Sequence, residues 1–85
     1  MGFNLLKAAQ ERFMTDRVIT NSIRMLRFLN NEMTQKQLAE AIGVTRQTVM
    51  AIEANKYSPS LEVAFKISEV FSLPLEEVFQ YKEVE

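Results

Sequence analysis

The sequence contains neither cysteine nor histidine, so the side chains most often used for nucleophilic catalysis and metal binding are missing. Disulfide frameworks, iron–sulfur clusters and the usual zinc sites are excluded for the same reason. The adjacent carboxylates Glu76 and Glu77 are most simply a solvated helix start, where negative charge stabilises the helix dipole. We therefore expect a protein that is not an enzyme and that holds no metal and no cofactor.

The most informative segment is residues 34–56, which predict a helix, a glycine turn and a second helix. Thr34 is the expected N-cap of a helix over 35–42, and Gln37 completes a capping box with it. Gly43 suits the left-handed position just past a helix end. Thr45 caps a second helix over about 46–55, which Asn55 ends. Two helices separated by so short a turn cross steeply, which is typical of a helix-turn-helix unit.

Further helices are predicted on both sides of this unit. They cover about 21–30 with Asn21 as N-cap, about 61–71 capped by Ser60, and about 74–81 starting at Pro74. Residues 3–13 predict a short amphipathic helix and 15–20 an extended linker, and no strand-like alternation is long enough for a sheet. The predicted fold class is all-α. The apolar side chains expected to face its core are Ile23, Leu26, Met33, Leu38, Ala39, Ile42, Val49, Ile52, Leu61, Ala64, Phe65, Ile67, Phe71, Leu75, Val78 and Phe79.

Several phrases in this region resemble the Xre/Cro/repressor family of helix-turn-helix regulators. They are residues 34–39 (TQKQLA), 43–49 (GVTRQTV), 52–53 (IE) and 56–61 (KYSPSL), and residues 73–79 are similar to the family's fifth helix. The resemblance covers about residues 21–81. It implies a compact five-helix, lambda-repressor-like domain whose third helix enters the major groove of double-stranded DNA.

The resemblance also implies which side chains meet the DNA. Gln35 would anchor on a phosphate at a helix start, where free N–H groups already point outward. Arg46, Gln47 and Thr48 would approach base edges from the first turn of the third helix. Ala51 is expected as a packing or thymine-methyl neighbour. The full expected DNA-binding set is Gln35, Thr45, Arg46, Gln47, Thr48, Ala51, Asn55, Lys56, Tyr57 and Ser58.

The chain departs from the family pattern at two places. Residues 53–56 read Glu-Ala-Asn-Lys where the family often has Glu-Asn-Gly-Lys, and Asn55 can replace glycine at a left-handed position. The link between the first two helices of the domain is about one residue longer than usual. In the family, an arginine of helix 1 often pairs with the glutamate of helix 3. The resemblance implies that this ion pair joins Arg27 to Glu53 here.

The charge distribution favours a dimer. The net charge is −1, but residues 1–56 carry a net +3 and residues 57–85 a net −4. Because affinity for phosphates scales with the number neutralised, a monomer this weakly basic is expected to bind DNA modestly. We therefore expect a homodimer on a two-fold symmetric operator. The candidate dimer surfaces are the N-terminal helix and the fifth helix with its tail, namely Leu73, Leu75, Val78 and Tyr81.

The expected organisation is an N-terminal extension over 1–20, a DNA-binding domain over 21–81 and an acidic tail over 82–85. Residues 1–13 either dimerise, fold back on the domain, or form a dispensable extension, since Met14 is itself a candidate start. No apolar stretch approaches the ~18 residues of a membrane span, and a cytoplasmic location is expected. The alternative function is an antitoxin-like or other protein-interaction module on the same fold, with a small protein partner.

Overall fold

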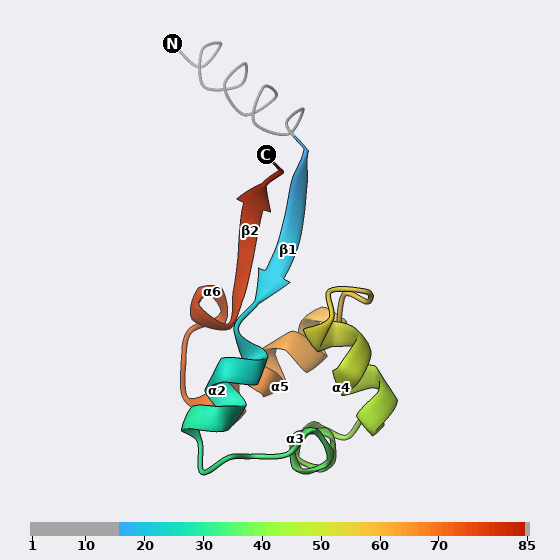
Figure 1. Ribbon diagram of the computed structural model, residues 1–85, viewed down its shortest axis with the longest axis vertical. Coiled ribbons are helices and arrows are strands. Elements are labelled where there is room, and N and C mark those ends of the chain that lie inside the picture. Colours follow the sequence, from blue (N-terminus) through green and yellow to red (C-terminus); the bar gives the residue numbers. More distant parts are fainter. Residues whose placement is uncertain (1–15, 85) are drawn as a thin grey trace.

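The computed structural model describes residues 16–84, and these form a bundle of short helices with a projecting arm of two strands (Figure 1). In chain order the elements are β1 (Arg17–Asn21), α2 (Ile23–Leu29), α3 (Gln35–Ile42), α4 (Arg46–Glu53), α5 (Leu61–Phe71), α6 (Leu75–Val78) and β2 (Phe79–Glu83). The amphipathic helix predicted for residues 3–13 lies outside the described residues. None of the described helices is long and apolar enough to cross a membrane.

The starts of the three central helices are set by side-chain caps, as predicted. Thr34 accepts a hydrogen bond from the backbone N–H of Gln37 at 3.0 Å, and the Gln37 side chain accepts from the Thr34 backbone N–H at 2.9 Å, so the capping box is complete. Thr45 and Ser60 cap α4 and α5 by accepting from the backbone N–H of Thr48 and of Val63, without the reciprocal bond of a capping box. Gly43 ends α3 in the left-handed region at φ 74°.

The boundaries of α2 and α4 differ slightly from the predicted ones. The predicted cap of α2, Asn21, is one residue too early, because Ser22 occupies the N-cap position. The Asn21 side chain nevertheless accepts from the backbone N–H of Ile23 at 3.1 Å. α4 ends at Glu53, and Asn55 is the left-handed terminator that the sequence predicts, with φ 59°.

The arm corrects the prediction that the fold lacks a sheet. β1 pairs antiparallel with β2, from Arg17 opposite Glu83 to Asn21 opposite Phe79. The predicted linker is therefore a strand, and the helix predicted for 74–81 ends at Val78 and continues as β2. The ladder joins segments about 60 positions apart, so neither strand carries a hairpin signal in its own neighbourhood. The fold is mostly helical, with five helices among the described residues, and the term all-α is approximate.

The core lies where α2, α3, α4, α5 and α6 meet. Its fully buried members are Ile23, Leu38, Ala39, Ile42, Val49, Ile52, Ile67 and Val78. The predicted core positions Leu61 and Phe65 are wrong, because their side chains are 66% and 50% exposed. The buried stripe of α5 is centred on Ala64 and Ile67. Phe65 is rotated roughly 100° from Ala64, and Leu61 lies in the first turn, at the edge of the bundle.

Candidate nucleic-acid interface

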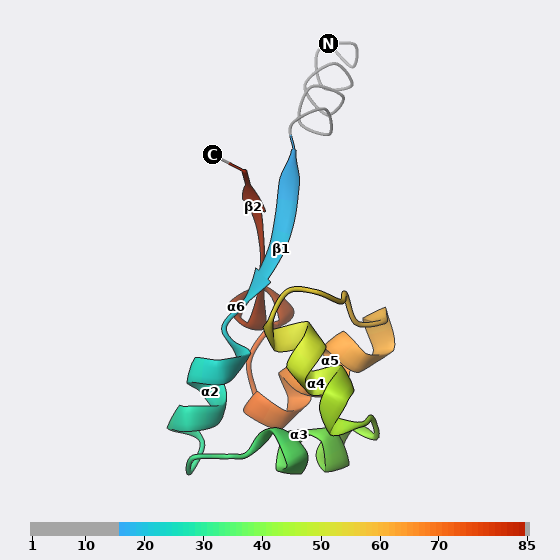
Figure 2. The same ribbon diagram turned by 45° about the vertical axis from the view of Figure 1, so that its right-hand side comes forward.

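α3 and α4 form the helix-turn-helix unit at the end of the molecule away from the arm (Figure 2). The turn between them is closed by the backbone N–H of Val44, which donates to the Ala39 carbonyl at 3.0 Å. Val44 also packs against the core, where Val49 is fully buried. The two helices are therefore fixed to each other by a tight turn and a shared core, and both of their N-termini remain at the surface.

The first turn of α4 presents two free polar side chains. Arg46 and Gln47 are exposed, and neither makes a side-chain hydrogen bond within residues 16–84. Thr48 is half-buried, and its hydroxyl lies 3.0 Å from the Thr45 hydroxyl, so both threonines serve the cap. Ala51 is half-buried one turn further along. Of the predicted reading residues, Arg46 and Gln47 are the ones whose side chains are free for a ligand.

The N-terminus of α3 lies beside that of α4. Gln35, Lys36 and Arg46 line one shallow hollow together with Arg27, Glu32, Met33 and Thr34. The dipoles and free N–H groups of the two helix starts, together with Lys36 and Arg46, favour an anion there against the single opposing carboxylate of Glu32. Lys36 is absent from the predicted site, although its place directly after Gln35 was a usable signal. It is exposed, as a phosphate contact requires.

A buried ion-pair network holds α4 against α2 and α3. Arg27 donates to both carboxylate oxygens of Glu53, with Nη2 3.0 Å from Oε1, and its Nη1 donates to the Met33 carbonyl at 2.8 Å. Gln35 Nε2 donates to the same Glu53 oxygen at 3.2 Å. The side chains of Arg27 and Glu53 are 14% and 9% exposed. The pairing implied by the family resemblance is therefore present, and Gln35 is oriented by it.

The longer link after α2 does not disturb this network. Asn31 and Glu32 both adopt left-handed backbone conformations, with φ 54° and 52°. The backbone N–H of Glu32 donates to the Phe28 carbonyl at 3.1 Å, and that of Met33 donates to the Arg27 carbonyl at 2.9 Å. Two consecutive left-handed residues coil the extra length into a tight turn, so Arg27 still reaches Glu53.

The remaining predicted residues lie at the other end of α4. Lys56, Tyr57 and Ser58 are exposed and follow the left-handed Asn55. An eight-residue helix is about 12 Å long, so these residues are separated from Arg46 by that length or more. The predicted set thus divides into a group at the start of α4 and a group just past its end.

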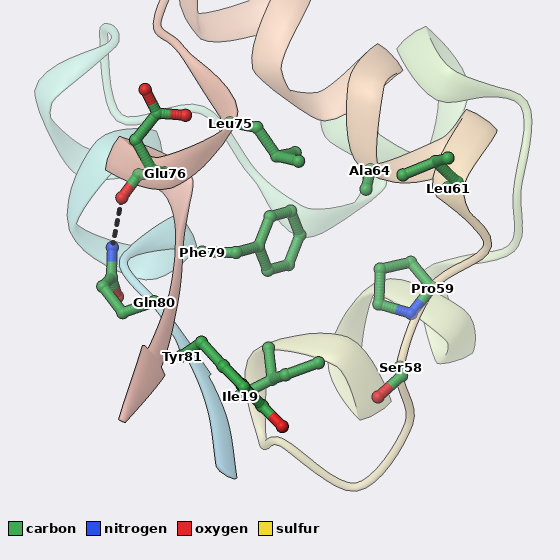
Figure 3. A pocket seen from close by; sticks show the side chains of 10 residues that line it. All are labelled: Ile19, Ser58, Pro59, Leu61, Ala64, Leu75, Glu76, Phe79, Gln80 and Tyr81. Atoms are coloured by element: carbon green, nitrogen blue, oxygen red, sulfur yellow. Dashed lines mark hydrogen bonds between the residues drawn. The ribbon is translucent and has the colours of Figure 1, made fainter. Parts of the chain in front are cut away.

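An apolar groove lies between the arm and the start of α5 (Figure 3). Its volume is about 730 Å³, and its lining is Ile19, Ser58, Pro59, Leu61, Ala64, Leu75, Glu76, Phe79, Gln80 and Tyr81. Leu61 and Tyr81 are 66% and 60% exposed there. Of the predicted dimer-surface residues, Leu75 and Tyr81 line this groove, whereas Val78 is 0% exposed and cannot contact a partner.

Known proteins with similar sequences are regulators. The family model HTH_3, described as helix-turn-helix, matches residues 23–78. The chain is 46% identical over 65 residues to the uncharacterized HTH-type transcriptional regulator MJ0272 of Methanocaldococcus jannaschii, covering 76% of this chain and 97% of that one. It is 52% identical over 50 residues to the uncharacterized HTH-type transcriptional regulator YgzD of Bacillus subtilis, covering 59% of this chain and 76% of YgzD.

Solved structures share the fold. The crystal structure of the transcriptional regulator VanUg aligns with a TM-score of 0.66 at 18% identity, over 85% of this chain and 95% of that one. A crystal structure from Bacteroides fragilis aligns with a TM-score of 0.64 at 24% identity, over 74% of this chain and all of that one. The family match covers more than half of the chain and includes every predicted site residue. The chain therefore belongs to the helix-turn-helix family of transcriptional regulators, which is not a family of enzymes.

Proposed function

We propose that this protein is a sequence-specific DNA-binding transcriptional regulator that places α4 in the major groove. The observation that carries the proposal is the pair of free side chains, Arg46 and Gln47, on the first turn of a helix that is rigidly held. Arginine can donate to the two acceptors of guanine, N7 and O6, and glutamine can donate to N7 of adenine while it accepts from the adenine N6 amino group. Thr45 and the Arg27–Glu53 pair fix the helix that presents them, so little conformational freedom is lost on binding.

Phosphate contacts on both sides of α4 would set its register on the duplex. Gln35 and Lys36 lie at the start of α3, where the dipole and free N–H groups favour a phosphate. Lys56, Tyr57 and Ser58 follow the other end of α4 and would meet the backbone there. Such contacts carry no sequence information, but they orient the helix that reads the bases. In this arrangement Thr48, Ala51 and Asn55 shape the reading surface from within α4 and its terminal turn.

The apolar groove is the surface through which we propose that two copies associate. The groove gathers exposed apolar side chains from the arm and from α5, and a second copy would remove them from water. Groups such as Ile19, Leu61 and Tyr81 would be covered by the same groups of a second copy, which a two-fold dimer requires. Two copies would contact two half-sites about 10 base pairs apart, or a multiple of that spacing. The net charge of −1 makes the second set of phosphate contacts important.

Selection from a pool of random duplexes tests the function. The expected result is a two-fold symmetric site whose binding, followed by fluorescence anisotropy, weakens as salt is raised. Analytical ultracentrifugation of the complex should give two protein chains per duplex. If no site is enriched and no duplex shows salt-sensitive binding, the proposed DNA-binding function is contradicted.

A protein-interaction module is the second candidate, and one surface favours it. Met25, Phe28 and Leu29 on α2 are 59%, 64% and 70% exposed, and none of them lines the groove. An apolar patch of this kind on a seven-residue helix is typical of a protein contact. A small protein captured in a one-to-one ratio by the wild type and lost with Phe28→Ser would support an antitoxin-like role. Capture that is unchanged by this substitution would remove the patch from consideration.

A further inference from the structure

We propose that Asn21 is a positioning residue for DNA binding, which holds the turn that follows α4 and so directs the Lys56–Ser58 loop at the phosphate backbone. The proposal rests on the proposed function, because it assigns a role to a residue that does not itself belong to the DNA-binding set. Asn21 is half-buried and ends β1 at the base of the arm. It acts through Asn55, at the point where α4 stops.

Every polar atom of the Asn21 side chain is engaged. Its Nδ2 donates to the Ile52 carbonyl at 2.9 Å and to Asn55 Oδ1 at 2.9 Å, with the Glu53 carbonyl 3.5 Å away. Its Oδ1 accepts from the backbone N–H of Ile23. One amide therefore ties the first residue of α2 to the last turn of α4, across more than 30 positions of sequence.

The last turn of α4 offers Asn21 both a backbone carbonyl and a side-chain acceptor. The backbone N–H of Lys56 donates to the Ala51 carbonyl at 2.9 Å, and that of Asn55 donates to the Ile52 carbonyl at 3.0 Å. This pair of bonds is a Schellman ending, which requires a left-handed residue at position 55. A glycine would supply that conformation without strain, but it would offer no side-chain acceptor. Asn55 supplies the acceptor, so in this chain a side chain outside α4, that of Asn21, can hydrogen-bond to the turn.

The position of Asn21 links two surfaces. In the strand ladder it is opposite Phe79, which lines the apolar groove. On its other side it holds the turn from which Lys56, Tyr57 and Ser58 emerge. The exit of α4 is thus tied by hydrogen bonds to the base of the arm, which gives the loop that follows it a defined direction.

The salt dependence of DNA binding separates positioning from stability. We compare the wild type, Asn21→Asp, Lys56→Ala and the double variant on the selected duplex, each well below its own melting temperature. An aspartate keeps the acceptor for Ile23 but sets a carboxylate against the Ile52 carbonyl and Asn55 Oδ1. Asn30→Asp is the matched control, because Asn30 is exposed and this substitution adds the same charge as Asn21→Asp. Asn55→Gly keeps the left-handed turn and removes Oδ1, the side-chain acceptor of Asn21.

Asn21→Asp is expected to reduce the slope of log K against log salt by about one, as Lys56→Ala does. The double variant should lose no more slope than Lys56→Ala alone, Asn55→Gly should change it in the same direction, and Asn30→Asp should leave it as in the wild type. A slope that Asn21→Asp leaves unchanged, or a loss that adds in full to that of Lys56→Ala, would overturn the proposal.

Amide hydrogen exchange tests whether Asn21 holds the last turn of α4, and it needs no DNA. A failure of this proposal can therefore be distinguished from a failure of the proposed function. Asn21→Asp should speed the exchange of the Asn55 and Lys56 amides by about tenfold relative to the Val44 amide, which closes the other turn. Asn30→Asp should leave this ratio unchanged. An unchanged ratio in Asn21→Asp would show that Asn21 does not hold the turn, whether or not the protein binds DNA.

Discussion

The helical body and the strand arm each contain an arginine–carboxylate pair, and the two pairs differ in the exposure of the carboxylate and in the number of hydrogen bonds. In the body, Arg27 and Glu53 are almost fully buried and share their bonds with Gln35 and the Met33 carbonyl. In the arm, Arg17 meets Glu83 through one contact of 3.1 Å, and the Glu83 side chain is 60% exposed. Arg17 also lies over the Tyr81 ring, 5.5 Å from its centroid.

The difference indicates that the two regions have different tasks. The body uses buried polar contacts to fix the angle between α3 and α4, which a DNA-reading surface needs. The arm has two unpaired edges and an apolar face, and a two-stranded sheet is marginally stable by itself. Its stability therefore depends on packing against the body and, in our proposal, on a second copy.

The largest expected effect on stability is that of Glu53→Ala. This change leaves the Arg27 guanidinium buried without its carboxylate and removes the acceptor of Gln35, so the free energy of unfolding should fall by about 3 kcal/mol. Urea denaturation followed by circular dichroism measures it. A loss below about 1 kcal/mol, the range of exposed pairs, would show that the network does not hold the body together.

Next in size is the effect of Leu61→Glu on operator binding. Charges placed in the apolar groove should shift the protein to monomers and weaken binding to the full site by about 100-fold, through loss of bivalency. Binding to a single half-site should stay the same, because Leu61 is 66% exposed and its replacement leaves the fold intact. Ultracentrifugation and anisotropy provide the two readouts.

Leu29→Glu is the matched control for this change, because Leu29 is 70% exposed and lies outside the groove. It adds the same charge and should remain a dimer. If both variants are monomers, or if both remain dimers, then the apolar groove is not the surface through which the two copies associate.

A smaller effect is expected for Thr45→Ala. The hydroxyl accepts from the Thr48 backbone N–H at 3.1 Å, and its removal should lower the free energy of unfolding by about 1 kcal/mol. Thr45→Ser keeps the cap and should stay within a few tenths of a kcal/mol of the wild type. Equal denaturation midpoints for the alanine and serine variants would contradict the role of the cap.

The smallest effect belongs to the arm. Glu83→Gln removes a pair whose carboxylate is solvent-exposed and should change the free energy of unfolding by less than about 0.5 kcal/mol, with the remainder screened by salt. Thermal melts of this variant and of Glu53→Gln, under identical conditions, compare the two pairs directly. A loss in Glu83→Gln as large as that in Glu53→Gln would mean that the arm is as tightly fixed as the body.

The sequence predicted the body well because its signals are local. Thr34, Gly43, Thr45 and Ser60 each act on residues at most a few positions away, and each occupies the predicted position. The arm escaped prediction because its ladder depends on a partner strand at the other end of the chain. The exposure of Leu61 was equally unpredictable, since it depends on where the bundle ends and not on the helical period of α5.

In the candidate site, too, the positions set by local signals could be predicted, whereas the contacts between distant segments could not. Arg46 and Gln47 stand where the motif places them, because a capped helix start exposes its first turn. Asn21 was predicted as an N-cap, and its bonds to Ile52 and Asn55 could not be read from its neighbours in sequence. Lys36 was visible in the sequence, but its position beside Arg46 follows from the crossing of α3 and α4.

The most direct test of the account is the base preference of Arg46→Ala and Gln47→Ala, measured at each position of the selected operator. Each substitution should cost about 1–3 kcal/mol of binding free energy and relax the preference at particular base pairs. Arg24→Ala, which removes an exposed charge from α2, should leave every preference intact. If Arg46→Ala and Gln47→Ala keep the wild-type base preferences, or if Arg24→Ala relaxes the same positions, then α4 is not the element that reads the DNA.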